Sequence, residues 1–425
     1  MTTQQRARNP RLFLYSACAI ALQTIIALVG VELVLRILDL RYLRLENGSN
    51  TLPYQHDPEI GWVPIANWVG PFTGLRTTTV RQNSLGLRDI EHEGGPRPTI
   101  MVVGDSFVWG YDVEAKERFT DLLRRPFSQY RIVNAGVAEY GTDQEYLLLQ
   151  RLWSKLTPQV VVLIFSQSND RADNSGNLAN DDYFKPYIAQ TPHGDWQFRG
   201  QPVPHPRYTY FRENWFVRNS LLGRLAVSAY VHLRQPRVRV PDPTEHLMGM
   251  MRDLVEARGS KFLVGLQVAE PQLETFLQAE KIPYVTLDGA VQYRDDGSHW
   301  TPSGHVVVAE RVGMLLTKAG IRPDDDYDYT IENHDEVVRI YPREAMAFVS
   351  RGSAYAARGQ FERAILDYDE AIRLDPGNVV ALHMRGLAHR DSGRLDRAIA
   401  DLDEAARLSP ANAALFQQSR PELAR

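Results

Sequence analysis

Ser106, Asn169, Asp296 and His299 stand at three separated places in the chain, each shortly after an apolar run. A serine hydroxyl is a weak nucleophile until an imidazole takes its proton, and a carboxylate can orient that imidazole. Ser106, His299 and Asp296, three residues before the histidine, supply these groups. The asparagine amide and the backbone N–H of Ser106 could stabilise the oxyanion that forms. Together they predict acyl transfer at an ester carbonyl.

Each motif is weak by itself. Asp and Ser cap helices well, so Gly104-Asp105-Ser106 also fits an ordinary helix start. Asp296 fits plain turn chemistry and His299 a surface loop, and Asn169-Asp170 fits a turn. The coincidence of all three at loop positions favours the catalytic interpretation.

The segments that must position these residues alternate between patterns typical of strands and patterns typical of helices. Short apolar runs predict strands, and longer polar-apolar stretches between several of them predict helices. This alternation indicates an α/β domain with a parallel sheet flanked by helices. The strands are expected at 99–103, 130–133, 160–165, 262–266 and, more weakly, 282–287, with helices at 144–156 and 244–256.

An uncharged apolar run spans residues 12–31, which as a helix would rise about 30 Å, the thickness of a bilayer core. It is too long for the apolar part of a cleaved signal peptide and predicts a transmembrane anchor; a buried core helix is the alternative. Three arginines precede the run and three follow it, so charge does not decide its orientation. Cys18, the one cysteine, lies within it and is expected to face lipid or pack.

The remaining segments differ in composition. Residues 45–98 predict a β-rich lead-in. Residues 171–243 interrupt the α/β rhythm, with a hairpin expected at 182–198 and one helix at 214–233, and would overhang the site. Seven acids without Lys or Arg at 324–336 indicate a solvated linker.

A 34-residue repeat follows the linker. Residues 345–378 and 379–412 align with small residues at equivalent places, such as Gly352 with Gly386. The period and pattern resemble the tetratricopeptide repeat, a helix pair. Two copies are fewer than the roughly three usually needed for stability, so residues 413–423 or the α/β domain must cap them. The repeats predict either a groove for a protein partner or a structural appendage.

Bulk composition excludes some functions. The formal charge of −4 gives no general basic face, so nucleic acid is not an expected partner. The sequence shows neither a metal-ligand cluster nor a phosphate-binding glycine loop, so we expect no cofactor. Trp109 and Trp300 flank the motifs and could stack on a sugar ring, although core packing is the more ordinary role.

Gly104-Asp105-Ser106, Asn169-Asp170 and Asp296-x-x-His299 together resemble blocks one, three and five of the SGNH (GDSL) hydrolase superfamily. Residues 83–88 and 143–145 resemble membrane-anchored bacterial members. The resemblance, over roughly 54–318, implies Ser106 as nucleophile, His299 as base and Asp296 as its orienter. Asn169 would be an oxyanion donor.

Two positions depart from the family pattern. Glu139 stands where block two has glycine, and Gln167 where block three opens with glycine. The block-two residue donates through its backbone, so Glu139 could still complete the oxyanion site with Ser106 and Asn169. Its carboxylate near a developing anion is unfavourable unless it points away.

The sequence thus predicts five parts: a tail and anchor (1–44), a lead-in (45–98), an SGNH domain (99–320), a linker (321–343) and repeats (344–425). Like its anchored relatives, the protein would sit in a bacterial inner membrane with its globular part in the periplasm. It would be an esterase acting on O-acyl esters, for which a cell-envelope glycan is the expected carrier. The alternatives are an O-acyltransferase, or a membrane-tethered scaffold with a weak or inert SGNH domain.

Overall fold

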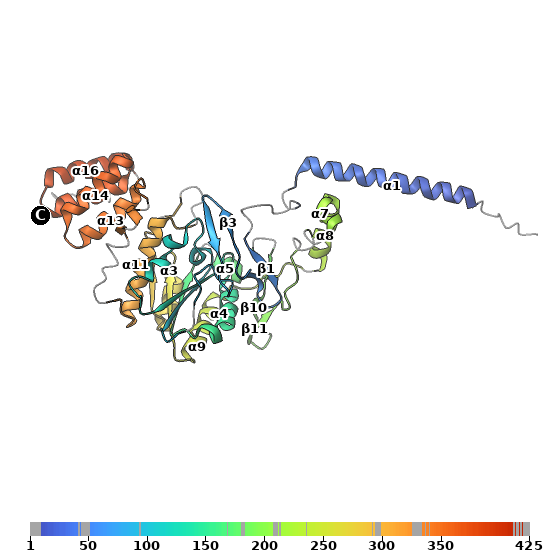
Figure 1. Cartoon of the computed structure of the whole chain (residues 1–425), viewed down its shortest axis with the longest axis horizontal. Coiled ribbons are helices and arrows are strands. Elements are labelled where there is room, and N and C mark those ends of the chain that lie inside the picture. The colour runs from blue at the N-terminus through green and yellow to red at the C-terminus, as the bar shows by residue number, and fades with distance from the viewer. Residues whose placement is uncertain are drawn as a thin grey trace, which may run out of the picture.

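The computed structural model places an apolar helix at one end, an α/β domain in the middle and a bundle of helix pairs at the other end (Figure 1). The following description covers residues 10–40, 43, 52–92, 95–167, 169–179, 183–206, 211, 214–234, 236–290, 292–293, 299–324, 334–335, 337–339, 341–410, 413, 416 and 419.

The centre of the α/β domain is a five-stranded sheet in the order β13-β12-β7-β5-β6. All its neighbouring strands pair in parallel. The prediction of a parallel sheet is confirmed, with strand ends within two residues of those expected except at β6, which continues to Gly136. The strands are β5 (Thr99–Gly104), β6 (Arg131–Gly136), β7 (Val160–Phe165), β12 (Lys261–Leu266) and β13 (Tyr284–Thr286).

Helices cover both faces of this sheet because its strands are apolar on both sides. On β5, Met101 and Val103 belong to one core with α4 (Thr142–Leu156), α9 (Thr244–Glu256) and α10 (Pro271–Ala279). Ile100 and Val102 belong to the opposite core. That core contains α3 (Phe119–Leu123) and α11 (Pro302–Lys318), and the short helices α2 (Ser106–Trp109), η2 (Ala115–Glu117) and α5 (Asp170–Asn174) complete the domain.

Two antiparallel hairpins precede the sheet. The first pairs β1 (Tyr54–Asp57) with β2 (Gly61–Pro64), and the second pairs β3 (Val69–Thr73) with β4 (Thr77–Arg81). Phe72 and Val80 of the second hairpin are buried against Trp109, which follows the predicted nucleophile.

The described residues of the insertion after β7 include two small hairpins and, after them, the helices α7 and α8. The hairpins pair β8 (Leu178–Ala179) with β9 (Tyr183–Phe184), and β10 (Tyr187–Gln190) with β11 (Trp196–Arg199). The prediction of one helix over 214–233 is wrong, because α7 (Trp215–Asn219) ends at Ser220 and α8 (Leu221–Arg234) begins after it. Ser220 is extended (φ −121°, ψ 121°), and the first amides of α8 donate to Glu32 instead of continuing α7.

The terminal elements are helical. The first helix, α1 (Pro10–Leu38), extends beyond the predicted apolar run, and its segment Cys18–Leu38 is long and apolar enough to cross a membrane. The repeats form four helices: α13 (Ala345–Ala357), α14 (Phe361–Leu374), α15 (Val379–Asp391) and α16 (Leu395–Leu408). Most of the expected acidic linker and of the capping segment 413–423 lies outside the described residues.

Small residues let the helices of each repeat approach closely. A Cβ on Gly352 would lie 2.7 Å from Tyr368 Cε1, and one on Gly386 would lie 3.0 Å from Leu402 Cγ. The two glycines are 34 residues apart, so the period read from the sequence corresponds to one helix pair.

Candidate active site

Ser106 lies where β5 ends and α2 begins, at the carboxyl edge of the sheet. Asp105 is the N-cap of α2, and its side chain accepts a hydrogen bond from the Phe107 amide at 3.0 Å. Gly104 makes the tight turn possible, because a Cβ there would lie 2.4 Å from Val108 Cγ2. The capping interpretation of the motif therefore holds, and Ser106 is the first residue of the capped helix.

His299 meets Ser106 although 193 residues separate them. Its Nε2 lies 2.9 Å from Ser106 Oγ, the distance of a hydrogen bond. The imidazole stacks on the Tyr111 ring, with centroids 4.4 Å apart and planes at 10°. It also packs against Phe107, with centroids 5.3 Å apart. This packing limits rotation of the ring and keeps Nε2 directed at the hydroxyl.

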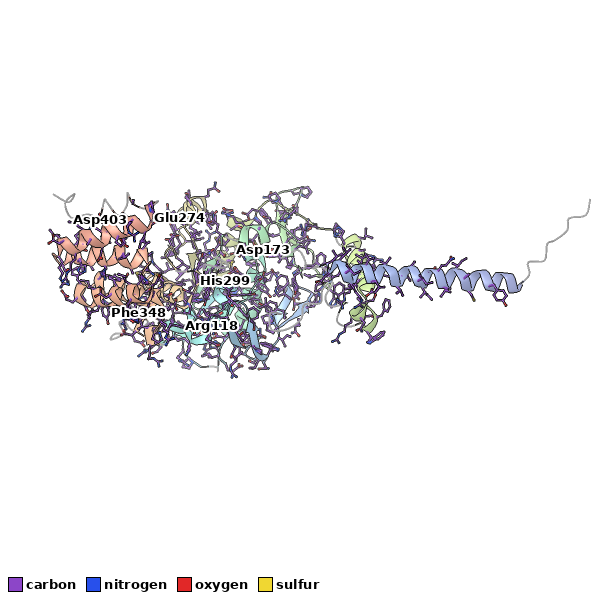
Figure 2. The ribbon with its side chains drawn as sticks, turned by 90° about the horizontal axis from the view of Figure 1, so that it is seen from above. Arg118, Asp173, Glu274, His299, Phe348 and Asp403 are labelled. Carbon is purple, nitrogen blue, oxygen red and sulfur yellow. The ribbon has the colours of Figure 1, made fainter. Side chains whose placement is uncertain are left out.

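The loop before α11 carries His299 and is closed at its base. The Tyr293 amide donates to the His299 carbonyl at 3.0 Å, and Gln292 and Trp300 form an antiparallel bridge. Figure 2 labels His299 inside the α/β domain. Asp296, the predicted orienting carboxylate, lies within this loop but outside the described residues.

Asn169 reaches the same edge from the end of β7. Its Nδ2 donates to Asp105 Oδ2 at 3.0 Å, which places the amide beside the residue that precedes Ser106. The nearby Asp173 has its pKa raised to about 6 by burial, and a hydrogen bond with the Asn169 side chain partly offsets this rise. The predicted oxyanion donor therefore faces two carboxylates in this structure.

Glu139 follows β6 and has a left-handed backbone, with φ at +70°. This conformation costs a non-glycine residue roughly 1 kcal/mol and is the one that glycine adopts freely. Position 139, where the resembled motif has glycine, thus has a backbone shape that suits glycine while carrying a glutamate. Tyr54 of the lead-in donates to the carbonyl of Ala138, the preceding residue, at 3.2 Å. Burial and then the Glu139 charge raise the pKa of Tyr54. Gln167, the other departure, is exposed.

Buried carboxyl groups gather behind the serine. Asp105, Glu145 and Asp170 are each at most 1% exposed. Burial raises the pKa of Asp105 to about 6. Burial first, and then the charges of the other acids, raises the pKa of Glu145 and Asp170 well above the ordinary range. Among the residues that the structure describes, neither Glu145 oxygen nor Asp170 Oδ1 has a hydrogen-bond partner, so the surroundings of both groups favour the neutral form.

Sequence reasoning missed a buried ion pair in this region. Lys185, from the insertion, contacts Asp143 at the start of α4, and both side chains are fully buried. The Lys185 ammonium also donates to the Pro186 carbonyl at 3.1 Å. A single lysine in a loop segment is usually solvated, so the sequence around Lys185 does not predict that it is buried. Only the motif 143–145 could have indicated the ion pair. The pair ties the insertion to the helix that carries Glu145.

Arg88 supports the turn that follows α2, the short helix that begins with Ser106. This buried guanidinium donates to the carbonyls of Trp109, at 3.2 Å, and Val113, at 2.8 Å, and also contacts the Gly110 carbonyl. Trp109 and Trp300 are at most 1% exposed, so both pack in the core and neither offers a face to a sugar. Among the described residues, no group of three or more His, Cys, Asp or Glu side chains could hold a metal ion.

Comparison with known proteins identifies the C-terminal helices. Family models of the tetratricopeptide repeat match residues 352–390 and 379–412. The chain therefore carries tetratricopeptide repeats at its C-terminal end, as the 34-residue period predicted. No curated protein matches the chain.

Solved structures resemble two parts of the chain. The TPR2B domain of yeast Sti1, in a complex with pHsp70, is 21% identical and covers 28% of this chain and 98% of its own, with a TM-score of 0.24. The second TPR domain of human RPAP3, in complex with an HSP70 peptide, is 24% identical, with coverages of 27% and 92% and a TM-score of 0.23. TesA is 15% identical and covers 52% of this chain and 98% of its own, with a TM-score of 0.30.

Proposed function

We propose that the α/β domain is an SGNH-type serine esterase that acts on O-acyl esters through an acyl-enzyme. The observation that carries this proposal is the 2.9 Å approach of His299 Nε2 to Ser106 Oγ at the carboxyl edge of a parallel sheet. A buried serine beside a packed imidazole matches the geometry of an activated nucleophile. The substrate class, an ester on a cell-envelope glycan, rests on the family resemblance of the motifs.

In the proposed mechanism, His299 Nε2 takes the Ser106 proton as Oγ attacks the ester carbonyl. The Ser106 amide and the Asn169 side chain donate to the oxyanion, with the Glu139 amide as a third donor. Asn169 must then turn an N–H from the neighbouring carboxylates toward the substrate. The tetrahedral intermediate collapses as His299 protonates the leaving alcohol, and Ser106 keeps the acyl group.

The second half of the reaction decides between two activities. If His299 activates a water molecule, attack on the acyl-Ser106 releases a carboxylic acid, and the enzyme is an esterase. If a sugar hydroxyl attacks instead, the enzyme is an O-acyltransferase. Asp296 is proposed to orient the imidazole in both halves.

Release of nitrophenol from a p-nitrophenyl acetate substrate, with and without added sugar, tests both activities. We expect Ser106→Ala to abolish release, while Ser350→Ala in the repeats leaves it unchanged. Acetylated sugar as the main product would establish the transferase, and free acetate the esterase. Equal turnover by the wild type and Ser106→Ala would refute either serine mechanism.

We also propose that α1 anchors the chain in a bacterial inner membrane with the globular part in the periplasm. The segment Cys18–Leu38 has the required length, and its side chains are mostly exposed in this structure. We divide the chain into an anchor (1–44), a lead-in (45–98), a catalytic domain (99–320), a linker (321–343) and repeats (344–425). A periplasmic reporter fused to the C-terminus should be active, and an active cytoplasmic reporter would overturn this topology.

A second candidate function is that of a membrane-tethered scaffold. In this case the repeats bind a protein partner, and the α/β domain has weak esterase activity or none. A cavity of about 510 Å³ separates α11 from the first helix of each repeat. Its lining is mainly apolar and includes Val307, Val349, Val380, Met346 and Met384. Such a lining suits apolar side chains of a protein segment. A folded protein without esterase activity would favour this scaffold function.

A further inference from the structure

The two helices of the insertion carry large exposed apolar side chains. Trp215 is 77% exposed, Phe216 61%, Tyr230 53% and Leu233 82%. On α8 the exposed residues Ala226, Ala229, Tyr230 and Leu233 recur three or four positions apart, which places them on one side of the helix. Tyr230 and Leu233 are therefore neighbours one turn apart on α8, and large apolar side chains exposed side by side often mark a site of interaction.

The same helices are bound to α1. The Glu32 carboxylate of α1 accepts hydrogen bonds from Ser220 Oγ, at 3.0 Å, and from the Leu221 and Leu222 amides, at 3.0 and 2.9 Å. Arg36 of α1 donates to the Asn219 carbonyl at 3.0 Å. Two charged residues near the end of an apolar segment therefore have partners on α7 and α8, and Glu32 caps α8. Figure 1 shows α7 and α8 beside the end of α1 nearest the α/β domain.

The charge of this region has one sign. Residues 214–239 include five arginines and no Asp or Glu. The arginines are Arg218, Arg224, Arg234, Arg237 and Arg239. A helix with an apolar side, exposed aromatic residues and a basic surround is the type that lies in a bilayer interface and attracts anionic headgroups.

We propose that α7 and α8 form a membrane-interface element, whose occupant is the anionic lipid surface from which α1 emerges. This inference rests on the proposed anchoring by α1, to which the element is hydrogen-bonded through Glu32 and Arg36. The element belongs to the same insertion as Lys185, which is held by Asp143 beside the acids behind Ser106. The α/β domain would then have a second contact with the membrane, through its insertion, in addition to the anchor.

Spin labels in the full-length protein, reconstituted in nanodiscs with phosphatidylglycerol, can test the position of α8. Cys18 is first replaced by Ser, which leaves a chain without cysteine. Single labels are then placed through Leu233→Cys on α8, Leu22→Cys on α1 and Leu366→Cys on α14. These leucines are 82%, 59% and 67% exposed in the protein, so none of the substitutions disturbs a core.

The readout is the ratio of label accessibility to oxygen, which concentrates in lipid, over accessibility to a water-soluble nickel chelate. We expect the ratio at position 233 to exceed that at position 366 by about threefold or more, and to approach that at position 22. An aqueous ratio at position 22 would overturn the anchor itself. A lipid ratio at 22 with an aqueous ratio at 233 would overturn only the interface element.

Two further outcomes separate other occupants. If the label at position 233 is shielded from both reagents, a protein covers the element and the proposal is wrong. Dilution with unlabelled protein would then show whether that protein is a second copy, through the loss of spin-spin broadening. Nanodiscs made only of phosphatidylcholine should lower the ratio at position 233. An unchanged ratio would refute the preference for anionic headgroups.

Discussion

The catalytic edge, by which we mean the carboxyl edge of the sheet with Ser106 and His299, differs from the repeat pair in how far apart in the sequence its contacting residues lie. In the repeats, Arg351 pairs with Asp367 at 2.7 Å and Arg385 pairs with Asp401 at 2.6 Å, both across 16 residues. The second pair is the first one shifted by 34 positions. At the catalytic edge, by contrast, one hydrogen bond spans 193 residues and occurs once. Local contacts repeat with the sequence, whereas the site depends on the whole sheet being assembled.

The two regions meet at one polar junction. Arg76 of the lead-in donates to Tyr341 Oη at 3.1 Å, next to the first repeat, and to Tyr293 Oη at 3.3 Å, in the loop that carries His299. Ser303, at the start of α11, donates to Glu344 at 3.2 Å. The repeats therefore contact the elements that position the imidazole, and changes in one region can reach the other through few bonds.

The largest effect should come from breaking the catalytic edge alone. His299→Ala removes the base and should lower kcat on a p-nitrophenyl ester by about 10³ to 10⁴-fold. The urea midpoint of unfolding should change little, because the imidazole is half-buried and at the surface end of the sheet. His383→Ala in the repeats is the matched control and should retain full kcat. A loss of less than tenfold in His299→Ala would argue against the proposed base.

A substitution in the repeats should destabilise them without changing the candidate active site. Gly352→Val places a side chain where even a Cβ would lie 2.7 Å from Tyr368, and overpacking of this kind costs about 1–3 kcal/mol. We expect a lower urea midpoint for the repeats while esterase activity per folded molecule persists. Gly377→Ala is the control, because its new Cβ would meet only Asp375 Oδ1 at an ordinary 3.6 Å. Equal midpoints for both variants would contradict the packing argument.

A pH series distinguishes the acid cluster from ordinary surface carboxylates. Burial raises the pKa of Glu145, so the folded state binds more protons than the unfolded state above the ordinary glutamate pKa. Stability contributed by this group is therefore present at low pH and is lost as pH rises toward the raised pKa. Glu145→Gln removes the ionisable group and should raise the urea midpoint at pH 8 more than at pH 5.

The exposed Glu256→Gln on α9 serves as the control for that series, since the side chain is solvated in the folded and unfolded states alike. It should shift the midpoint by the same small amount at both pH values. A Glu145→Gln variant that behaves like Glu256→Gln would show that Glu145 is ionised in the folded protein at no cost.

The smallest effect is expected at the junction. Arg76→Gln removes bonds to Tyr293 and Tyr341 and an ion pair with Glu117 at 3.2 Å. We expect kcat to fall about two- to fivefold, since partly exposed ion pairs contribute about 1 kcal/mol or less. KM should stay unchanged if the arginine acts only by positioning the histidine loop. A rise in KM with constant kcat would instead assign Arg76 to substrate binding.

Much of the fold could be predicted because periodicity and propensity act locally. The limits of β7 and α9 agree with those expected, and the 34-residue period predicted the helix pairs. The break at Ser220 could not be predicted, since it depends on a carboxylate 188 residues earlier in the chain. The sequence also gives no sign that Lys185 is buried, because its partner Asp143 reaches it only in the folded domain.

In the candidate site, too, the residue types could be predicted from the sequence, whereas several of the contacts between distant residues could not. The order of the motifs led to Ser106 and His299, which the fold brings within hydrogen-bond distance. The catalytic roles of these two residues, and those of Asn169, Glu139 and Asp296, stay predictions. Glu139 has a left-handed backbone conformation that glycine adopts more readily, which a sequence pattern cannot reveal. The packing of Tyr111 on His299 was also missed, because stacking of side chains from two loops has no signature in either loop.

Covalent labelling with a fluorophosphonate probe tests the central claim most directly. The probe phosphonylates a serine only when a neighbouring base activates it, and peptide mass spectrometry identifies the modified residue. We expect a single adduct on Ser106 in the folded wild-type protein, and its loss in His299→Ala. An adduct on another residue, or none on protein whose sheet and repeats are intact, would contradict a Ser106–His299 nucleophile.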